Sequence, residues 1–335
     1  AETCATLNRT WGYSKFDDQW KKPEEIVRLL ADVVSKNANY LLNIGPDALG
    51  RVPEGSVKVL REVGRWLQTH GEAIYATEPS PFPVNFDWGT VTRRPGKLYF
   101  HIFSTNVDEL KLVGIDNRIK RACFLDDPEH ECPVTQRYIE VEGQEKLAEL
   151  SVPVTPAPNA APHRVLALEY EGELNVRNDD IQQADGSVVL ESLRAVDAQT
   201  GESIAPRIMQ RGAVASSLKE GNRIQWRFLI HSPGEFAVIA DCAAGRYTDH
   251  GGRKVIDTGH LVSFEVEDQS LSAEIKDGER SPIRGNPHWQ CVRSKLGSLK
   301  FSRPGWYTLT MTVDRVNIDA GGGLILRNIS LQPVS

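Results

Sequence analysis

A short, almost wholly apolar segment, NYLLNIGP at residues 39–46, constrains the fold of this chain more than any other feature. Strands of this kind are buried on both faces and occur in parallel sheets, which helices cover. Amphipathic helices are predicted on either side, one beginning at Pro23 and one at Pro53. Helix, buried strand, loop and helix form a β/α repeat. We therefore expect residues 1–79 to be the last part of a (β/α)8-like barrel whose earlier strands are missing.

Apolar periodicity supports both helix predictions. In the first helix, apolar residues recur at i, i+3, i+4, i+7 and i+8, at Ile26, Leu29, Leu30, Val33 and Val34. Asn37 is its predicted end. The second helix places Val57, Leu60, Val63 and Leu67 on one face and ends at Gly71, a residue type that often follows a helix.

The sequence pattern changes at about Pro79, where the breaker cluster PSPFP begins. Short β-rich runs follow, separated by Gly, Pro, Asp and Asn. They predict a β-sandwich over residues 80–174, a linker over 175–186, and a second, jelly-roll-like sandwich over 187–335. The predicted fold class is therefore multi-domain, with an α/β part followed by two all-β parts.

Composition excludes several classes of partner. The net charge is −6, and Lys and Arg are scattered, which argues against nucleic acid. No stretch approaches the roughly 20 apolar residues of a membrane span. The five cysteines and eight histidines show no zinc spacing, so we expect no metal and no cofactor. Cys123 and Cys132 either close a short disulfide loop or remain thiols, and buried thiols are the favoured alternative.

Three linked segments resemble a known family. ETCATLNRTWGY, LLADVVSKNANYLLNIGP and LREVGRWLQTHGEAIY are similar, in order and spacing, to the closing part of the catalytic domain of glycoside hydrolase family 29, the α-L-fucosidases. The family's barrel is followed by a β-sandwich, which suits residues 80–174. Residues 187–335 are more loosely similar to carbohydrate-binding-type modules of bacterial fucosidases and sulfatases.

The resemblance implies an activity, namely hydrolysis of terminal α-L-fucosyl linkages with retention through a fucosyl-enzyme intermediate. It implies that Glu2 is the general acid/base, although Ala1 stands where the family usually has Trp. A retaining glycosidase needs two carboxylates about 5–5.5 Å apart. The family's nucleophilic Asp lies upstream of this chain, so we expect residues 1–335 to be inactive until the missing barrel half is supplied in cis or in trans.

The implied partners are fucosylated oligosaccharides or glycoconjugates, with neither nucleic acid nor membrane insertion. Such substrates are met outside the cytoplasm, so the expected location is periplasmic or extracellular. The competing hypothesis is a non-catalytic carbohydrate-binding protein with a vestigial barrel segment.

Four other positions are candidates with structural alternatives. Trp11 is either a sugar platform or a core residue. Asn43 either contributes to the site or orients a neighbouring loop. Trp289, in the turn-like GNPHWQC, is the candidate for stacking on sugar in the last domain, whereas Trp226 alternates with core residues.

Two further features complete the expectations for the first 80 residues. Asp17 and Asp18 lie in the polar run SKFDDQWKK and are predicted to be solvated. Without its neighbouring strands, the 39–46 segment is expected to expose apolar side chains, leaving this part poorly packed.

Overall fold

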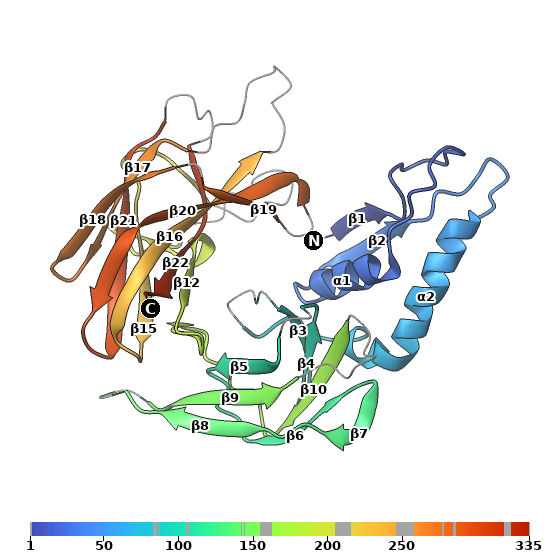
Figure 1. Ribbon diagram of the computed structural model, residues 1–335, viewed down its shortest axis with the longest axis horizontal. Coiled ribbons are helices and arrows are strands. Elements are labelled where there is room, and N and C mark those ends of the chain that lie inside the picture. Colours follow the sequence, from blue (N-terminus) through green and yellow to red (C-terminus); the bar gives the residue numbers. More distant parts are fainter. Residues whose placement is uncertain are drawn as a thin grey trace. The chain divides into compact units, whose positions relative to one another are not determined.

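The computed structural model describes residues 2–82, 86, 88–104, 107–141, 143, 145–154, 163–204, 216–245, 258–276, 278–283, 286–317 and 323–334. The chain forms two compact units, one of residues 1–137 and 148–178 and the other of residues 138–147 and 179–335. Among the described residues, most elements are β-strands, and two α-helices lie near the N-terminus (Figure 1). Within the described ranges, no helix combines the length and apolar character that crossing a membrane demands.

The first unit opens with alternating strands and helices. β1 (Glu2–Thr6), α1 (Pro23–Val34), β2 (Asn39–Asn43) and α2 (Glu54–His70) follow in order, and η1 (Gly71–Ala73) extends the last helix. β1 and β2 are parallel and paired in register from Glu2 opposite Asn39 to Thr6 opposite Asn43. The predicted β/α repeat is therefore present (Figure 1).

Local sequence explains both ends of α1. Pro23 occupies the first turn, where its missing N–H has no intrahelical partner to lose, and Glu25 accepts a hydrogen bond from the Lys22 N–H at 3.1 Å. Asn37, the predicted end, has a φ of 54°, which turns the chain out of the helix.

Gly71 differs from the prediction. Its φ is −60°, so it does not take the left-handed conformation of a helix-ending glycine. A Cβ at this position would lie 2.9 Å from Cε2 of Tyr75, whose ring packs against the glycine. The glycine at this position allows the Tyr75 ring to approach the backbone closely.

The two faces of the β1–β2 pair differ. Tyr40, Leu42 and Ile44 pack with the helices around a core formed by Leu7, Ile26, Val27, Val59 and Val63. The alternate residues face the other way, and Leu41 is 46% exposed. The exposure of Leu41 agrees with the expectation that this segment, without its neighbouring strands, exposes apolar side chains. The expectation of poor packing is wrong for the opposite face, which packs against the helices.

Two antiparallel sheets complete the first unit. One has the order β3-β4-β10-β6-β7 and the other the order β5-β9-β8. They enclose a common apolar core that includes Leu98, Phe100, Leu112 and Leu166. The strands are β3 (Gly89–Arg94), β4 (Lys97–Ile102), β5 (Glu109–Val113), β6 (Ile119–Phe124), β7 (Asp127–Glu131), β8 (Thr135–Ile139), β9 (Leu147–Pro153) and β10 (Arg164–Tyr170).

In the described part of the second unit, all elements are β-strands apart from the short η2 (Ser192–Arg194). One sheet contains β11 (Asp180–Ile181), β13 (Val196–Asp197), β15 (Arg223–Ile230), β17 (His260–Val266), β18 (Gln269–Ile275) and β21 (Gly305–Arg315). The other contains β12 (Val188–Glu191), β14 (Ser216–Leu218), β16 (Gly234–Gly245), β19 (Glu279–Ile283), β20 (Asn286–Phe301) and β22 (Leu324–Pro333). One large core contains residues of both sheets, including Trp226 as predicted.

Part of the predicted linker 175–186 is a structural element of the second unit. β11 pairs with β15, and Gln182 is 1% exposed. The Gln182 side-chain oxygen accepts hydrogen bonds from the N–H groups of His231 and Ser232, at 3.0 and 2.8 Å. These buried contacts fix residues that composition alone assigned to a flexible connection.

Candidate functional site at the carboxyl ends of the parallel strands

The loops that follow β1 and β2 meet where these strands end. Asn43, the last residue of β2, donates a hydrogen bond from Nδ2 to the carbonyl oxygen of Trp11 at 2.6 Å. The structure therefore brings together two predicted site residues that are 32 positions apart. This hydrogen bond agrees with the alternative in which Asn43 orients a neighbouring loop. A contact between Asn43 and a substrate stays a prediction.

Asp17 organises the loop after β1. Its carboxylate accepts hydrogen bonds from the N–H groups of Arg9 and Thr10 at 2.9 and 3.0 Å, from the Thr10 hydroxyl at 3.0 Å, and from the Gln19 N–H at 3.3 Å. Desolvation acts to raise the pKa of Asp17, but the hydrogen bonds from Thr10, Gln19 and Arg9 outweigh it and lower the pKa. The prediction of a purely solvated carboxylate at Asp17 is wrong, because this side chain closes the loop.

Asp47 has the same role in the loop after β2. It accepts hydrogen bonds from the N–H groups of Leu49 and Arg51, both at 2.9 Å, and from Nε of Arg51 at 2.8 Å. The bond from the Arg51 N–H is the main reason that the pKa of Asp47 is lowered. Both loops are thus held by internal hydrogen bonds, which suits a site that must be formed before a ligand arrives.

Exposed apolar side chains gather on these two loops. Trp11 is 58% exposed, Tyr13 53%, Phe16 85% and Leu49 75%. The core alternative for Trp11 is therefore wrong. Sequence reasoning missed Tyr13 and Phe16, although the run WGYSKF signals them by placing three aromatics in one loop. Large apolar groups exposed on ordered loops mark contact surfaces, and flat aromatic rings suit the apolar face of a sugar.

Glu2 lies elsewhere. It begins β1, and its register partner is Asn39, whereas Asn43 pairs with the last residue of that strand. Four residues of strand correspond to about 13 Å. Enzymes built on (β/α)8 barrels carry their active sites at the carboxyl ends of the strands, so the structure does not bring Glu2 together with Trp11 and Asn43. Its predicted acid/base role remains a prediction.

Cys4 is the nearest polar contact recorded for Glu2, with its Sγ 3.7 Å from the carboxylate. Desolvation and then the Glu2 charge raise the pKa of the Cys4 thiol.

Trp289 lies in β20, but its side chain is outside the described residues, so its predicted sugar contact stays a prediction.

All five cysteines are free thiols. Cys132 packs with the core between the two sheets, on the side of Ala122 and Phe124. Cys123, between those two residues in β6, points to the opposite face and lines a pocket there. The disulfide alternative is therefore wrong, because the two thiols lie on different faces of the sheet.

The arrangement at the carboxyl ends of β1 and β2 defines a class of protein. Parallel strands alternate with helices, and exposed aromatic and amide groups gather at the carboxyl ends of the strands, as in α/β enzymes that bind small polar ligands. Comparison with known families makes this class specific. Residues 1–72 match the family model for α-L-fucosidase, so this segment is similar to the α-L-fucosidases, which are glycoside hydrolases.

The similarity extends to individual relatives. The chain is 30% identical over 130 residues to an α-L-fucosidase of Dictyostelium discoideum, covering 37% of this chain and 28% of that protein. It is 43% identical over 81 residues to the tissue α-L-fucosidase of Mus musculus, covering 23% of this chain and 18% of that protein. The crystal structure of an α-L-fucosidase from Vibrio sp. strain EJY3 matches with 28% identity and a TM-score of 0.76, over 99% of this chain and 54% of that one. The chain thus spans about half the length of the Vibrio protein.

Proposed function

We propose that this chain is the distal part of an α-L-fucosidase that hydrolyses terminal α-L-fucosyl linkages of oligosaccharides or glycoconjugates. One observation carries the proposal: a structural match over 99% of the chain to an α-L-fucosidase, with both units included. The family match over residues 1–72 supports it independently.

We further propose that residues 1–79 are the closing part of a (β/α)8-like barrel, followed by sandwiches over 80–174 and 187–335. The parallel pairing of β1 and β2 and the exposed Leu41 on their open face support this architecture. The other barrel strands, supplied in cis or in trans, would pair with these two and cover that face.

The proposed reaction proceeds with retention, so it uses a nucleophile and a general acid/base. The nucleophilic Asp is proposed to lie outside this chain, and Glu2 is the proposed acid/base. Trp11 would offer its exposed ring to the apolar face of fucose, and Asn43 would hold the Trp11 loop in place through its 2.6 Å hydrogen bond.

The test is turnover of an aryl α-L-fucoside. The chain alone is expected to be inactive, and activity is expected once the upstream half is restored or added. Activity of the chain alone would overturn the proposal that the nucleophilic Asp lies outside this chain. Absence of activity in the restored protein, together with retained glycan binding, would favour the non-catalytic carbohydrate-binding alternative.

Glu2 is tested in the restored protein. Glu2→Gln is expected to reduce kcat by several orders of magnitude if it is the acid/base, because the paired carboxylates act as a unit. Glu24→Gln, an exposed carboxylate in the first turn of α1, is the control and should leave kcat unchanged. Full activity of Glu2→Gln would show that Glu2 is not the general acid/base, which agrees with its place at the start of β1. The proposal that the protein is a fucosidase would be unaffected.

We propose a periplasmic or extracellular location, since glycans of this kind are met there. Fractionation of cells that express the natural gene tests this, and activity confined to the cytoplasm would contradict it.

A further inference from the structure

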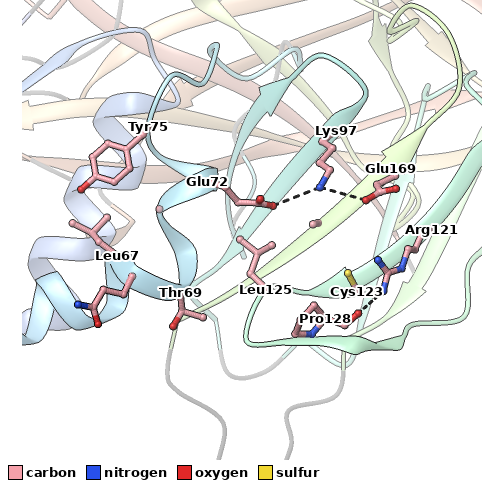
Figure 2. A pocket seen from close by; sticks show the side chains of 13 residues that line it. Leu67, Thr69, Glu72, Tyr75, Lys97, Arg121, Cys123, Leu125, Pro128 and Glu169 are labelled. Carbon is pink, nitrogen blue, oxygen red and sulfur yellow. Dashed lines mark hydrogen bonds and ion pairs between the residues drawn. The ribbon is translucent and has the colours of Figure 1, made fainter.

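A pocket of about 510 Å³ lies in the first unit, between the end of α2 with η1 and the outer face of the β3-β4-β10-β6-β7 sheet (Figure 2). This volume is within the range of small-molecule sites. The pocket adjoins the C-terminal end of α2, a helix of 17 residues and so about 25 Å long. The candidate site at the carboxyl ends of β1 and β2 adjoins the opposite end of the same helix, so the two sites are separate.

Strand register builds the floor of the pocket. In one row across the sheet, Glu169 of β10 lies between Lys97 of β4 and Arg121 of β6. In the next row, Ala167 lies between Tyr99 and Cys123. The small side chain of Ala167 leaves the depression open, while larger residues flank it.

Charged groups from three elements converge on the rim. Lys97 Nζ lies 3.3 Å from Oε1 of Glu169 and 3.7 Å from Oε1 of Glu72, which comes from η1 (Figure 2). These side chains are between 32% and 40% exposed, so a ligand can reach them. Unused carboxylate lone pairs and ammonium protons remain available for hydrogen bonds.

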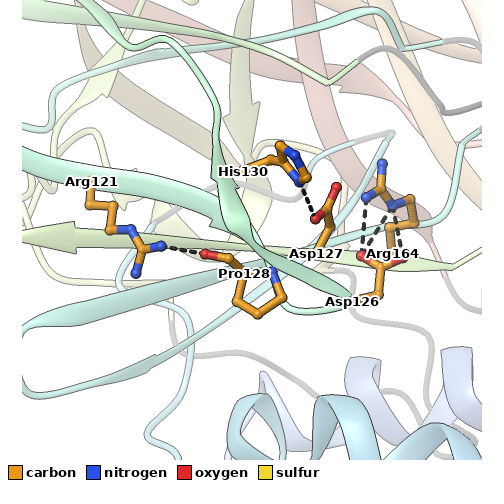
Figure 3. A network of polar contacts seen from close by, with 6 residues as sticks. All are labelled: Arg121, Asp126, Asp127, Pro128, His130 and Arg164. Atoms are coloured by element: carbon orange, nitrogen blue, oxygen red, sulfur yellow. Dashed lines mark hydrogen bonds and ion pairs between the residues drawn. The ribbon is translucent and has the colours of Figure 1, made fainter.

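Arg121 is anchored at the other side of the pocket. Its Nε lies 3.0 Å from Oε1 of Glu131. A second guanidinium nitrogen donates to the carbonyl oxygen of Pro128, as Figure 3 shows. Among the described lining residues, the charged groups are Glu72, Lys97, Arg121 and Glu169, so positive and negative charges balance. A balanced set favours a neutral polar ligand over an ion.

Tyr99 lies in the row next to Lys97, on the same face of the sheet. It is 1% exposed, and burial, followed by the charge of Glu72, raises the pKa of its hydroxyl to about 12, so this group stays protonated.

Apolar side chains complete the lining. Leu67 of α2 and Leu125 after β6 contribute to its walls, with Ala167 in the floor. A ligand suited to this pocket has an apolar face and several hydroxyl groups that bridge neighbouring carboxylates and an ammonium group, and it carries no net charge. Neutral saccharides combine these properties.

We propose that this pocket is a second saccharide-binding site that takes a neutral sugar unit of a glycan, remote from the candidate catalytic face. The choice of glycan as ligand class rests on the proposed function. Glu72, Lys97 and Glu169 bind vicinal hydroxyl groups, and Leu67 and Leu125 contact the apolar sugar face. Such a site would hold an extended glycan on the enzyme between successive hydrolytic events.

Titration calorimetry of the full chain with the neutral trisaccharide 2′-fucosyllactose tests the proposal. Glu169→Gln and Lys97→Met are expected to weaken binding at least about tenfold, because each removes a charged hydrogen-bonding partner. The matched control is Glu171→Gln, two residues further along, since Glu171 pairs with Arg118 and does not line the pocket. Fucose 1-phosphate is expected to bind more weakly than the trisaccharide.

Two more variants separate this site from the candidate active site. Ala167→Leu should abolish the Glu169-sensitive binding by filling the floor, whereas Trp11→Ala should leave it unchanged. Unchanged affinity in both Glu169→Gln and Lys97→Met, with folding verified by circular dichroism, would overturn the inference. Binding that is lost in these variants while the restored protein shows no turnover would retain the pocket and refute only the fucosidase proposal.

Discussion

At the scale of single residues, side-chain hydrogen bonds decide the shape of the candidate site. Asn43 holds the Trp11 carbonyl, and Asp17 and Asp47 each satisfy several backbone N–H groups of their own loops. Asn and Asp favour such local bonds, so their presence in loops was informative, but which groups they bind depends on the folded chain. These bonds place aromatic side chains on ordered loops.

Asn43→Ala is expected to lower the free energy of unfolding of the first unit by about 1 kcal/mol, the usual effect of losing one such hydrogen bond. Urea denaturation followed by tryptophan fluorescence measures it. Asn39→Ala is the control, because Asn39 lies on the same face of β2 and no side-chain hydrogen bond is recorded for it. Equal losses in both variants would show that the bond to Trp11 contributes nothing specific.

At the scale of elements, an aromatic contact joins α2 to the outer face of the β3-β4-β10-β6-β7 sheet. Trp66 stacks on His70 with ring centroids 4.6 Å apart, and its Nε1 donates to the carbonyl oxygen of His163 at 3.3 Å. His70 is 5% exposed, and its burial lowers its pKa below 6.5, which outweighs the opposing effect of its hydrogen bond to the Trp66 carbonyl oxygen. The interface therefore favours neutral His70.

The first unit should lose stability as pH falls. The pKa of His70 is lower in the folded state than in the unfolded chain, so its contribution is complete above about pH 6.5 and is lost as the unfolded state binds the proton at lower pH. Thermal unfolding between pH 7.5 and 5 should show a falling midpoint. His70→Gln should reduce this pH dependence.

His130 provides a control of opposite sign. It is largely exposed and paired with Asp127, which raises its pKa, so its contribution is present below about pH 6.5 and lost at higher pH (Figure 3). His130→Gln should therefore not reduce the fall in midpoint toward acid pH. A pH profile that is identical in His70→Gln and the parent protein would show that other groups cause the acid loss.

At the scale of the whole molecule, the chain consists of two compact units with separate apolar cores. Trp226 is the largest fully buried side chain of the second core, and its Nε1 donates to the Glu191 carbonyl oxygen at 2.8 Å. Trp226→Ala should destabilise the second unit by about 3–5 kcal/mol. Calorimetry should then show one transition at lower temperature and an unchanged first-unit transition.

Trp306→Ala is a milder control on the same sheet, because Trp306 is only half-buried. If both transitions shift equally in Trp226→Ala, the two units unfold as one cooperative block, and the assignment of separate cores would not describe separate stabilities.

The sequence by itself determined the elements whose signals are local. Apolar spacing located α1 and α2, and alternation placed Trp226 in a core. Helix α1 ends at Val34, three residues before Asn37, where the left-handed φ turns the chain. Three linked motifs in the first 75 residues indicated the similarity to α-L-fucosidases that the family model matches over residues 1–72, because residue types at fixed spacing can be compared without knowledge of contacts.

Only the tertiary structure decided features that depend on residues far apart in the chain. The apolar composition of β2 indicated burial, but exposure of Leu41 depends on which strands lie beside it. The separation of Glu2 from Trp11 follows from strand register and direction, and the opposite orientations of Cys123 and Cys132 follow from which face each residue occupies. A sequence pattern indicates whether a side chain prefers water or a core. Which residues that side chain contacts depends on how the entire fold packs.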